Sequence, residues 1–114
     1  MAKMNREVLK QRYLRDDVPV QISGIAANLA RGGSFIRNVK NRDVVMGLLD
    51  ESKYFVDWCA PRTDIDKAAR LVELQRQRAA WQFSLDKIWP DQNQRLSVGD
   101  ASLKWSDEIL AMTS

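Results

Sequence analysis

Residues 63–90 read TDIDKAARLVELQRQRAAWQFSLDKIWP and decide the fold, because apolar residues recur in them at helical spacing. One row follows a three-four spacing that only Arg78 interrupts, and it consists of Leu71, Leu74, Trp81, Leu85 and Ile88. A second row lies on another side of the same helix and consists of Ile65, Ala68, Val72, Ala79 and Phe83. A helix with two apolar sides needs packing partners on both. We therefore expect residues 64–89 to form the central helix of a bundle.

The two ends of this helix and its one misplaced charge can also be interpreted. Thr63 is placed to cap the first turn, and Asp66 occupies the position of the reciprocal acid in a capping box. Pro90 stops the helix after Trp89. Arg78 has two open interpretations: its stem covers the core while the guanidinium reaches solvent, or it pairs with an acid of another helix or of a partner. We expect the solvated arrangement.

The segment that follows has the same period. Residues 91–112 predict a last helix whose apolar row repeats every seven residues and consists of Leu96, Leu103 and Leu110. Gly99 costs such a helix about 1 kcal/mol relative to alanine, which would allow a break near residues 97–100. This row and the second row of residues 63–90 exceed what a small bundle can cover. Their burial favours a homodimer or another protein partner.

Three further helices are predicted before residue 63. Residues 42–59 carry one apolar face, and Pro61 enforces the end of that helix. Residues 5–15 form a short first helix. Between these two, Val18-Pro19 opens a helix, and Gly32-Gly33 is expected to stop it.

The sequence as a whole predicts an all-α fold. No segment alternates strictly between apolar and polar residues, and no Asn-Gly or Asp-Gly hairpin turn occurs. Four to five helices with short connections indicate an antiparallel bundle. The length of 114 residues fits a single domain over residues 1–114, and 45% hydrophobic with 29% charged residues is an ordinary globular balance.

Several features indicate a cytoplasmic setting. No stretch approaches the roughly 18 apolar residues that a membrane span needs. The first 17 residues carry basic side chains but no apolar run behind them, so they do not predict a secretory signal. The single cysteine, Cys59, cannot form an internal disulfide. It is predicted at the C-terminal end of a helix and on its apolar face, which favours a buried and unreactive thiol.

The composition argues against catalysis and against cofactors. The chain has no histidine, which removes the commonest general base and the commonest nitrogen ligand of transition metals. One cysteine cannot build a thiolate zinc site or an iron–sulfur cluster. No glycine-rich phosphate loop occurs. We therefore predict no enzymatic activity, no metal site and no cofactor.

The charge is uneven and points to a partner for the N-terminal third. Residues 1–42 have a net charge of +6, whereas residues 43–114 have −3. Within segment 21–41, QISGIAANLARGGSFIRNVKN, the apolar and small residues resemble a DNA-binding helix-turn-helix, although Arg31 and Gly32-Gly33 depart from its pattern. Four basic residues gather there as candidate contacts to phosphates or to an acidic protein: Arg31, Arg37, Lys40 and Arg42.

Two of the four tryptophans fall outside the predicted apolar rows. Trp58 precedes Cys59, and Trp89 ends its helix beside Pro90. Each is a candidate interface anchor, because exposed tryptophans often carry binding energy. Covering an end of the bundle is the alternative and more common role, whereas Trp81 and Trp105 lie on apolar rows and are expected in the core.

Four stretches together resemble a group of small helical proteins of cyanobacteria without established activity. They are SGIAANLAR (23–31), LLDESKYFVDWCAP (48–61), LVELQRQRAAW (71–81) and KWSDEILAM (104–112). The resemblance implies a helical fold and a cytoplasmic setting only. From the sequence we therefore predict a non-enzymatic adaptor or regulatory protein. The alternative is a DNA-binding transcriptional regulator that uses segment 21–41.

Overall fold

The computed structural model describes residues 5–114, and helices make up 87% of them. Lys3, which belongs to the basic N-terminal third, lies outside the described residues. The five α-helices are α1 (Arg6–Arg15), α2 (Val18–Phe35), α3 (Arg42–Cys59), α4 (Ile65–Ile88) and α5 (Gln92–Ala111). Two short 3₁₀ turns, η1 (Val39–Asn41) and η2 (Ala60–Arg62), flank α3. No strand occurs between residues 5 and 114. The predicted all-α bundle is confirmed.

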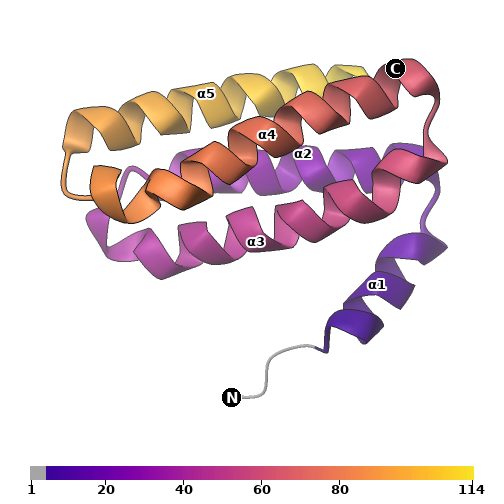
Figure 1. Cartoon of the computed structure of the whole chain (residues 1–114), viewed down its shortest axis with the longest axis horizontal. Coiled ribbons are helices and arrows are strands. Elements are labelled where there is room, and N and C mark those ends of the chain that lie inside the picture. Colours follow the sequence, from indigo (N-terminus) through magenta and orange to yellow (C-terminus); the bar gives the residue numbers. More distant parts are fainter. Residues whose placement is uncertain (1–4) are drawn as a thin grey trace.

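Helices α2 to α5 run alternately in opposite directions and form the bundle (Figure 1). The short helix α1 lies at one end of the bundle, against α3. Its Tyr13 ring stacks on the Phe55 ring of α3, with centroids 4.1 Å apart. The Tyr13 hydroxyl donates a 2.8 Å hydrogen bond to the carbonyl of Gln21, which fixes α1 to the start of α2.

The central helix is α2, which packs against both α3 and α5. It does not stop at Gly32-Gly33, as the sequence predicted, but continues through both glycines to Phe35. A Cβ atom on Gly33 would lie 2.8 Å from the carbonyl oxygen of Gly99 in α5. Helix α5 is likewise continuous through Gly99, so the predicted break is absent. Both glycines serve a close approach of two backbones, and this packing outweighs their low helix propensity.

Two serines of α5 complete the contact with α2. The Ser102 hydroxyl donates to the carbonyl of Leu29, and the Ser106 hydroxyl donates to the carbonyl of Ala26, both at 2.7 Å. Both serines are buried, so each hydroxyl needs a partner inside the protein. Small residues therefore allow α2 and α5 to pack closely, and two direct hydrogen bonds join them.

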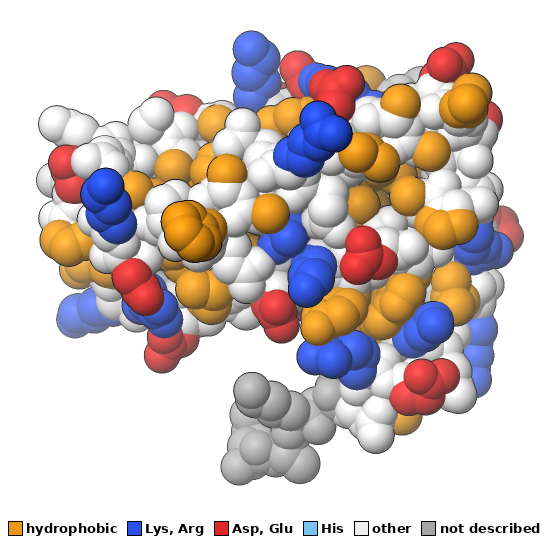
Figure 2. Space-filling view, in the orientation of Figure 1, with side chains coloured by type: hydrophobic (Ala, Val, Ile, Leu, Met, Phe, Trp, Pro, Cys, Tyr) orange, Lys and Arg blue, Asp and Glu red, His pale blue; other side chains and the backbone are white. Residues whose placement is uncertain are grey.

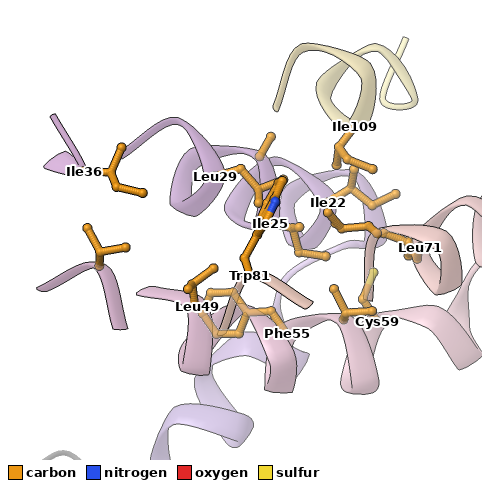
Figure 3. Close-up of a cluster of buried hydrophobic side chains, with 14 of the residues drawn as sticks. Ile22, Ile25, Leu29, Ile36, Leu49, Phe55, Cys59, Leu71, Trp81 and Ile109 are labelled. Carbon is orange, nitrogen blue, oxygen red and sulfur yellow. The ribbon is translucent and has the colours of Figure 1, made fainter. Parts of the chain in front are cut away.

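The hydrophobic core lies between the four long helices. Figure 3 shows side chains from α2, α3, α4 and α5 that converge on one cluster, with Trp81 reaching across it. Its labelled members are Ile22, Ile25, Leu29, Ile36, Leu49, Phe55, Cys59, Leu71, Trp81 and Ile109. The predictions that Trp81 and Cys59 are buried are confirmed.

The start of α4 differs in detail from the prediction. Asp64 is the N-cap, and its side chain accepts a 2.9 Å hydrogen bond from the backbone amide of Lys67. Thr63, the predicted cap, instead donates from its hydroxyl to the carbonyl of Ala60. A carboxylate suits the positive end of the helix dipole, which favours aspartate at this position. This cap fixes the first residue of α4.

Candidate interaction surface

The two apolar rows of α4 have different surroundings. The first row faces the core, and Leu71, Leu74 and Leu85 have no exposed surface. The second row faces solvent: Ile65 is 84% exposed, Val72 49% and Phe83 94%. The expectation that α4 is central and packed on both sides is therefore wrong for the single chain. Within residues 5–114, only one side of α4 is covered.

The covered side of α4 includes one charged residue. Arg78 is only 4% exposed, so the predicted solvated arrangement is wrong. Its guanidinium donates hydrogen bonds to the side-chain oxygens of Gln75 and Gln82, which lie one turn before and one turn after it. A third, longer bond reaches the carbonyl of Leu49 in α3 at 3.4 Å. Burial lowers the pKa of Arg78, because the charged form loses hydration.

The solvent-facing side of α4 has a regular composition. Ile65, Val72 and Phe83 alternate with smaller residues, Ala69 and Ala79, and with one charge, Arg76; all six are exposed. We call these six residues the outer face of α4. In Figure 2 orange apolar atoms lie along the course of α4, on the face of the molecule turned to the viewer.

A shallow groove of about 380 Å³ adjoins the middle of this face. From α4 it is lined by Val72, Gln75, Arg76 and Ala79, and from α3 and η2 by Val56, Asp57, Ala60 and Pro61. Most of these side chains are apolar, and the two charged residues that line the groove are Asp57 and Arg76. The outer face and the groove form one continuous apolar surface, because they share Val72, Arg76 and Ala79.

The helix-turn-helix suggested by segment 21–41 does not form. Residues 18–35 are one uninterrupted helix, so neither the turn at Arg31 nor a separate recognition helix exists. After Phe35 come residues 36–38 and then the short 3₁₀ turn η1, which is followed directly by α3. Gly32 and Gly33 lie inside α2, and Gly33 is in close contact with α5.

The four predicted basic contacts are placed differently from one another. Arg31 is exposed, and its guanidinium donates to the side-chain oxygen of Asn28 in the preceding turn. Arg42 is only 35% exposed along its side chain and forms ion pairs with Asp43 and Asp86. It thereby ties the start of α3 to the end of α4. Arg37 and Lys40 are exposed, and neither forms an ion pair among residues 5–114. Of the four, only Arg42 is held in ion pairs within the described part of the chain.

The two candidate tryptophan anchors are both in contact with other side chains. Trp89 is 9% exposed, and its indole nitrogen donates a 2.9 Å hydrogen bond to the carbonyl of Val39. The guanidinium of Arg95 lies 5.5 Å from the centroid of the same ring. Trp58 is half-buried beside the rings of Tyr13 and Tyr54, at 6.0 and 5.8 Å. Both side chains close an end of the bundle, and Trp89 offers little surface to a partner.

The side chains that could support chemistry are few. Burial raises the pKa of the Cys59 thiol, although the hydrogen bond with Tyr13 acts in the opposite direction. Burial also raises the pKa of Tyr13. Among the residues described, no three His, Cys, Asp or Glu side chains lie close enough to hold a metal ion. No helix in that part of the chain is long and apolar enough to cross a membrane.

Comparisons with protein-family models, with curated proteins and with solved structures find no match. Function is therefore inferred from the surface itself. Arg76 was not among the site residues predicted from the sequence, and Phe83 was expected to be packed. The spacing of the second row could have indicated both residues, because Phe83 belongs to that row and Arg76 falls on the same side of the helix, between Val72 and Ala79.

Proposed function

We propose that this protein is a non-enzymatic interaction protein of the cytoplasm, an adaptor or a regulator, and that it binds a protein partner through the outer face of α4. The observation that carries this proposal is the exposure of Ile65 and Phe83, 84% and 94%, on a helix whose opposite side already fills the core. That the protein has no enzymatic activity, as the sequence predicts, is part of the same proposal.

The free energy falls when a partner covers apolar side chains that are exposed to water. Each large apolar side chain that moves from water into a protein interface contributes about 1.5–3 kcal/mol. Single exposed apolar residues are common on any surface, but a continuous row beside an apolar groove is typical of an interaction site. Phe83 and Ile65 make no contribution to the core of the single chain. Their position is therefore explained by a partner and not by folding.

The basic N-terminal third gives less support to the alternative, DNA-binding regulation. Arg42 is paired with acids of its own chain, and Arg31 bonds Asn28. Sequence-specific DNA binding also needs an element that enters a groove, and segment 21–41 lacks the recognition helix. The resemblance to helical proteins of cyanobacteria stays a prediction.

The test is a pull-down of the purified, tagged protein from a lysate of the cells that make it, with and without nuclease. Val72→Ser and Phe83→Ser change the outer face, and Val20→Ser is the matched control, because Val20 is 53% exposed on α2. We expect a protein that the wild type and Val20→Ser capture and that both α4 variants lose, whether or not nuclease is added. Capture that disappears with nuclease, or that ignores the α4 substitutions, would contradict the proposal.

A further inference from the structure

The outer face of α4 has the spacing of a coiled-coil seam. The intervals along Ile65, Ala69, Val72, Arg76, Ala79 and Phe83 alternate between four and three residues without exception. This is the repeat with which two helices pack side by side, each side chain entering a space between side chains of the other helix. The occupant that fits such a seam is another helix of similar length.

The seam is also symmetric about Leu74. Counted outward from that residue, Ile65 and Phe83 are equally distant, as are Ala69 and Ala79, and Val72 and Arg76. A second copy of α4, antiparallel to the first, would place large residues against large ones and small against small. Twofold dimers require this self-complementarity, because residue i must contact residue j while j contacts i.

The one charge in the seam fits the same arrangement. Among residues 5–114, Arg76 forms no ion pair. In the antiparallel pairing it lies opposite the partner's Val72 and beside the partner's Glu73, so two reciprocal Arg76–Glu73 pairs flank the axis. Within its own chain Glu73 contacts Arg70 through one oxygen, Oε2. Its other oxygen remains available to the second copy.

The surface around the seam has room for the partner. The groove beside Val72 and Arg76 is where the partner's Val72 would project. Helix α4 lies on the broad face of the molecule, whose longest extent is 38 Å (Figure 2). A standard interface of about 800 Å² on each partner fits on such a face.

We propose that the partner of the outer face is a second copy of this chain, docked antiparallel along α4, with the twofold axis passing between the two helices at the level of Leu74. This inference rests on the proposed function and specifies its partner. Ile65 of each copy packs on the partner's Phe83, and the Arg76–Glu73 pairs fix the register.

Sedimentation equilibrium of purified wild type, Arg76→Glu, Glu73→Arg and the double variant tests this proposal. We expect a wild-type dimer at micromolar concentration, and a dissociation constant about tenfold higher or more for each single variant, since each creates two like-charge contacts. The double variant exchanges the charges and should return to within about threefold of wild type. Both residues are exposed, so circular dichroism should show all four proteins folded.

Phe83→Ser provides a second readout that does not depend on charge. We expect it to raise the dissociation constant by about 100-fold or more, because each dimer loses two anchors, whereas Val20→Ser leaves it unchanged. A wild-type protein that stays monomeric up to about 100 μM would overturn the inference, because the expected dimer forms at micromolar concentration. So would a dimer that is insensitive to the charge variants. If the monomer still captures a different protein through Val72 and Phe83, only this inference fails and the proposed function stands.

Discussion

Between α2 and α5, glycine and serine residues allow two backbones to approach closely. Along the outer face of α4, by contrast, the large apolar side chains of Ile65 and Phe83 are exposed to solvent. At the crossing, a Cβ on Gly33 or on Gly99 would meet the backbone of the opposite helix. On α4, Phe83 is 94% exposed and meets no neighbouring helix. The first region is buried within one chain, whereas the second is exposed. Apolar periodicity alone therefore does not distinguish a core face from an exposed face.

The two sides of α4 should differ most clearly at their arginines. Arg78→Ala removes the buried stem and leaves the oxygens of Gln75 and Gln82 without their donor, so we expect a loss of about 3 kcal/mol of unfolding free energy. The matched control is Arg76→Ala, two positions earlier on the outer face, with an expected change within about 0.5 kcal/mol. Urea unfolding at a concentration where both are monomeric measures the two values. Equal losses would show that the inner side of α4 has no special role for a cation.

The glycines allow a comparison that should reverse in sign. Gly33→Ala and Gly99→Ala insert a methyl group where backbone already lies within about 3 Å, and we expect each to destabilise the fold by about 1–3 kcal/mol. Gly32→Ala and Gly47→Ala meet nothing within 4 Å and lie inside helices, so each should stabilise by about 0.5–1 kcal/mol. The midpoint of urea unfolding distinguishes the pairs. Stabilisation by Gly33→Ala would refute the close approach of α2 and α5.

The smallest expected effect is a change of thermal stability with pH, and it tests the buried environment of Cys59 beside Tyr13. The pKa of Cys59 is raised in the folded protein, so the fold keeps its full stability below the unfolded pKa of about 8.5 and loses stability above it. We expect the melting temperature to fall between about pH 7.5 and 9.5, before Tyr13 titrates even in the unfolded chain. Cys59→Ala should start lower, since it leaves a cavity, but should lose less over the same range. An equal loss in both proteins would exclude Cys59 as the cause.

The sequence predicted the helices well because their signals are local. Apolar spacing, together with Pro61 after α3 and Pro90 after α4, predicted α3 over residues 42–59 and the ends of α1, α4 and α5 to within about a residue or two. The interruptions at Gly33 and Gly99 were wrong, because the propensity of glycine is a weak local preference that contact between α2 and α5 outweighs. No local pattern states that two glycines 66 positions apart in sequence will touch.

The candidate site was less predictable than the fold. The second row of α4 was visible in the sequence, but its exposure depends on how many helices surround α4, and the sequence does not give that number. The burial of Arg78 could have been predicted from its polar neighbours and not from the apolar rows. Gln75 and Gln82, at i−3 and i+4, place two amide oxygens beside its guanidinium. The basic residues near segment 21–41 looked like one group because they are close in sequence. In the structure Arg42 pairs with Asp86 of α4, a contact that the sequence does not indicate.

Disulfide cross-linking tests most directly whether the outer face of α4 joins two antiparallel copies. In a Cys59→Ala background, the double variant Ala69→Cys, Ala79→Cys should form a covalent dimer under mild oxidation, since the two positions oppose each other across the axis. Each single variant should stay monomeric on a non-reducing gel, because identical positions lie about 15 Å apart along the antiparallel pair, and an equimolar mixture of the two singles should form the cross-link. A double variant that yields no more covalent dimer than either single variant would show that the outer face of α4 does not join two antiparallel copies.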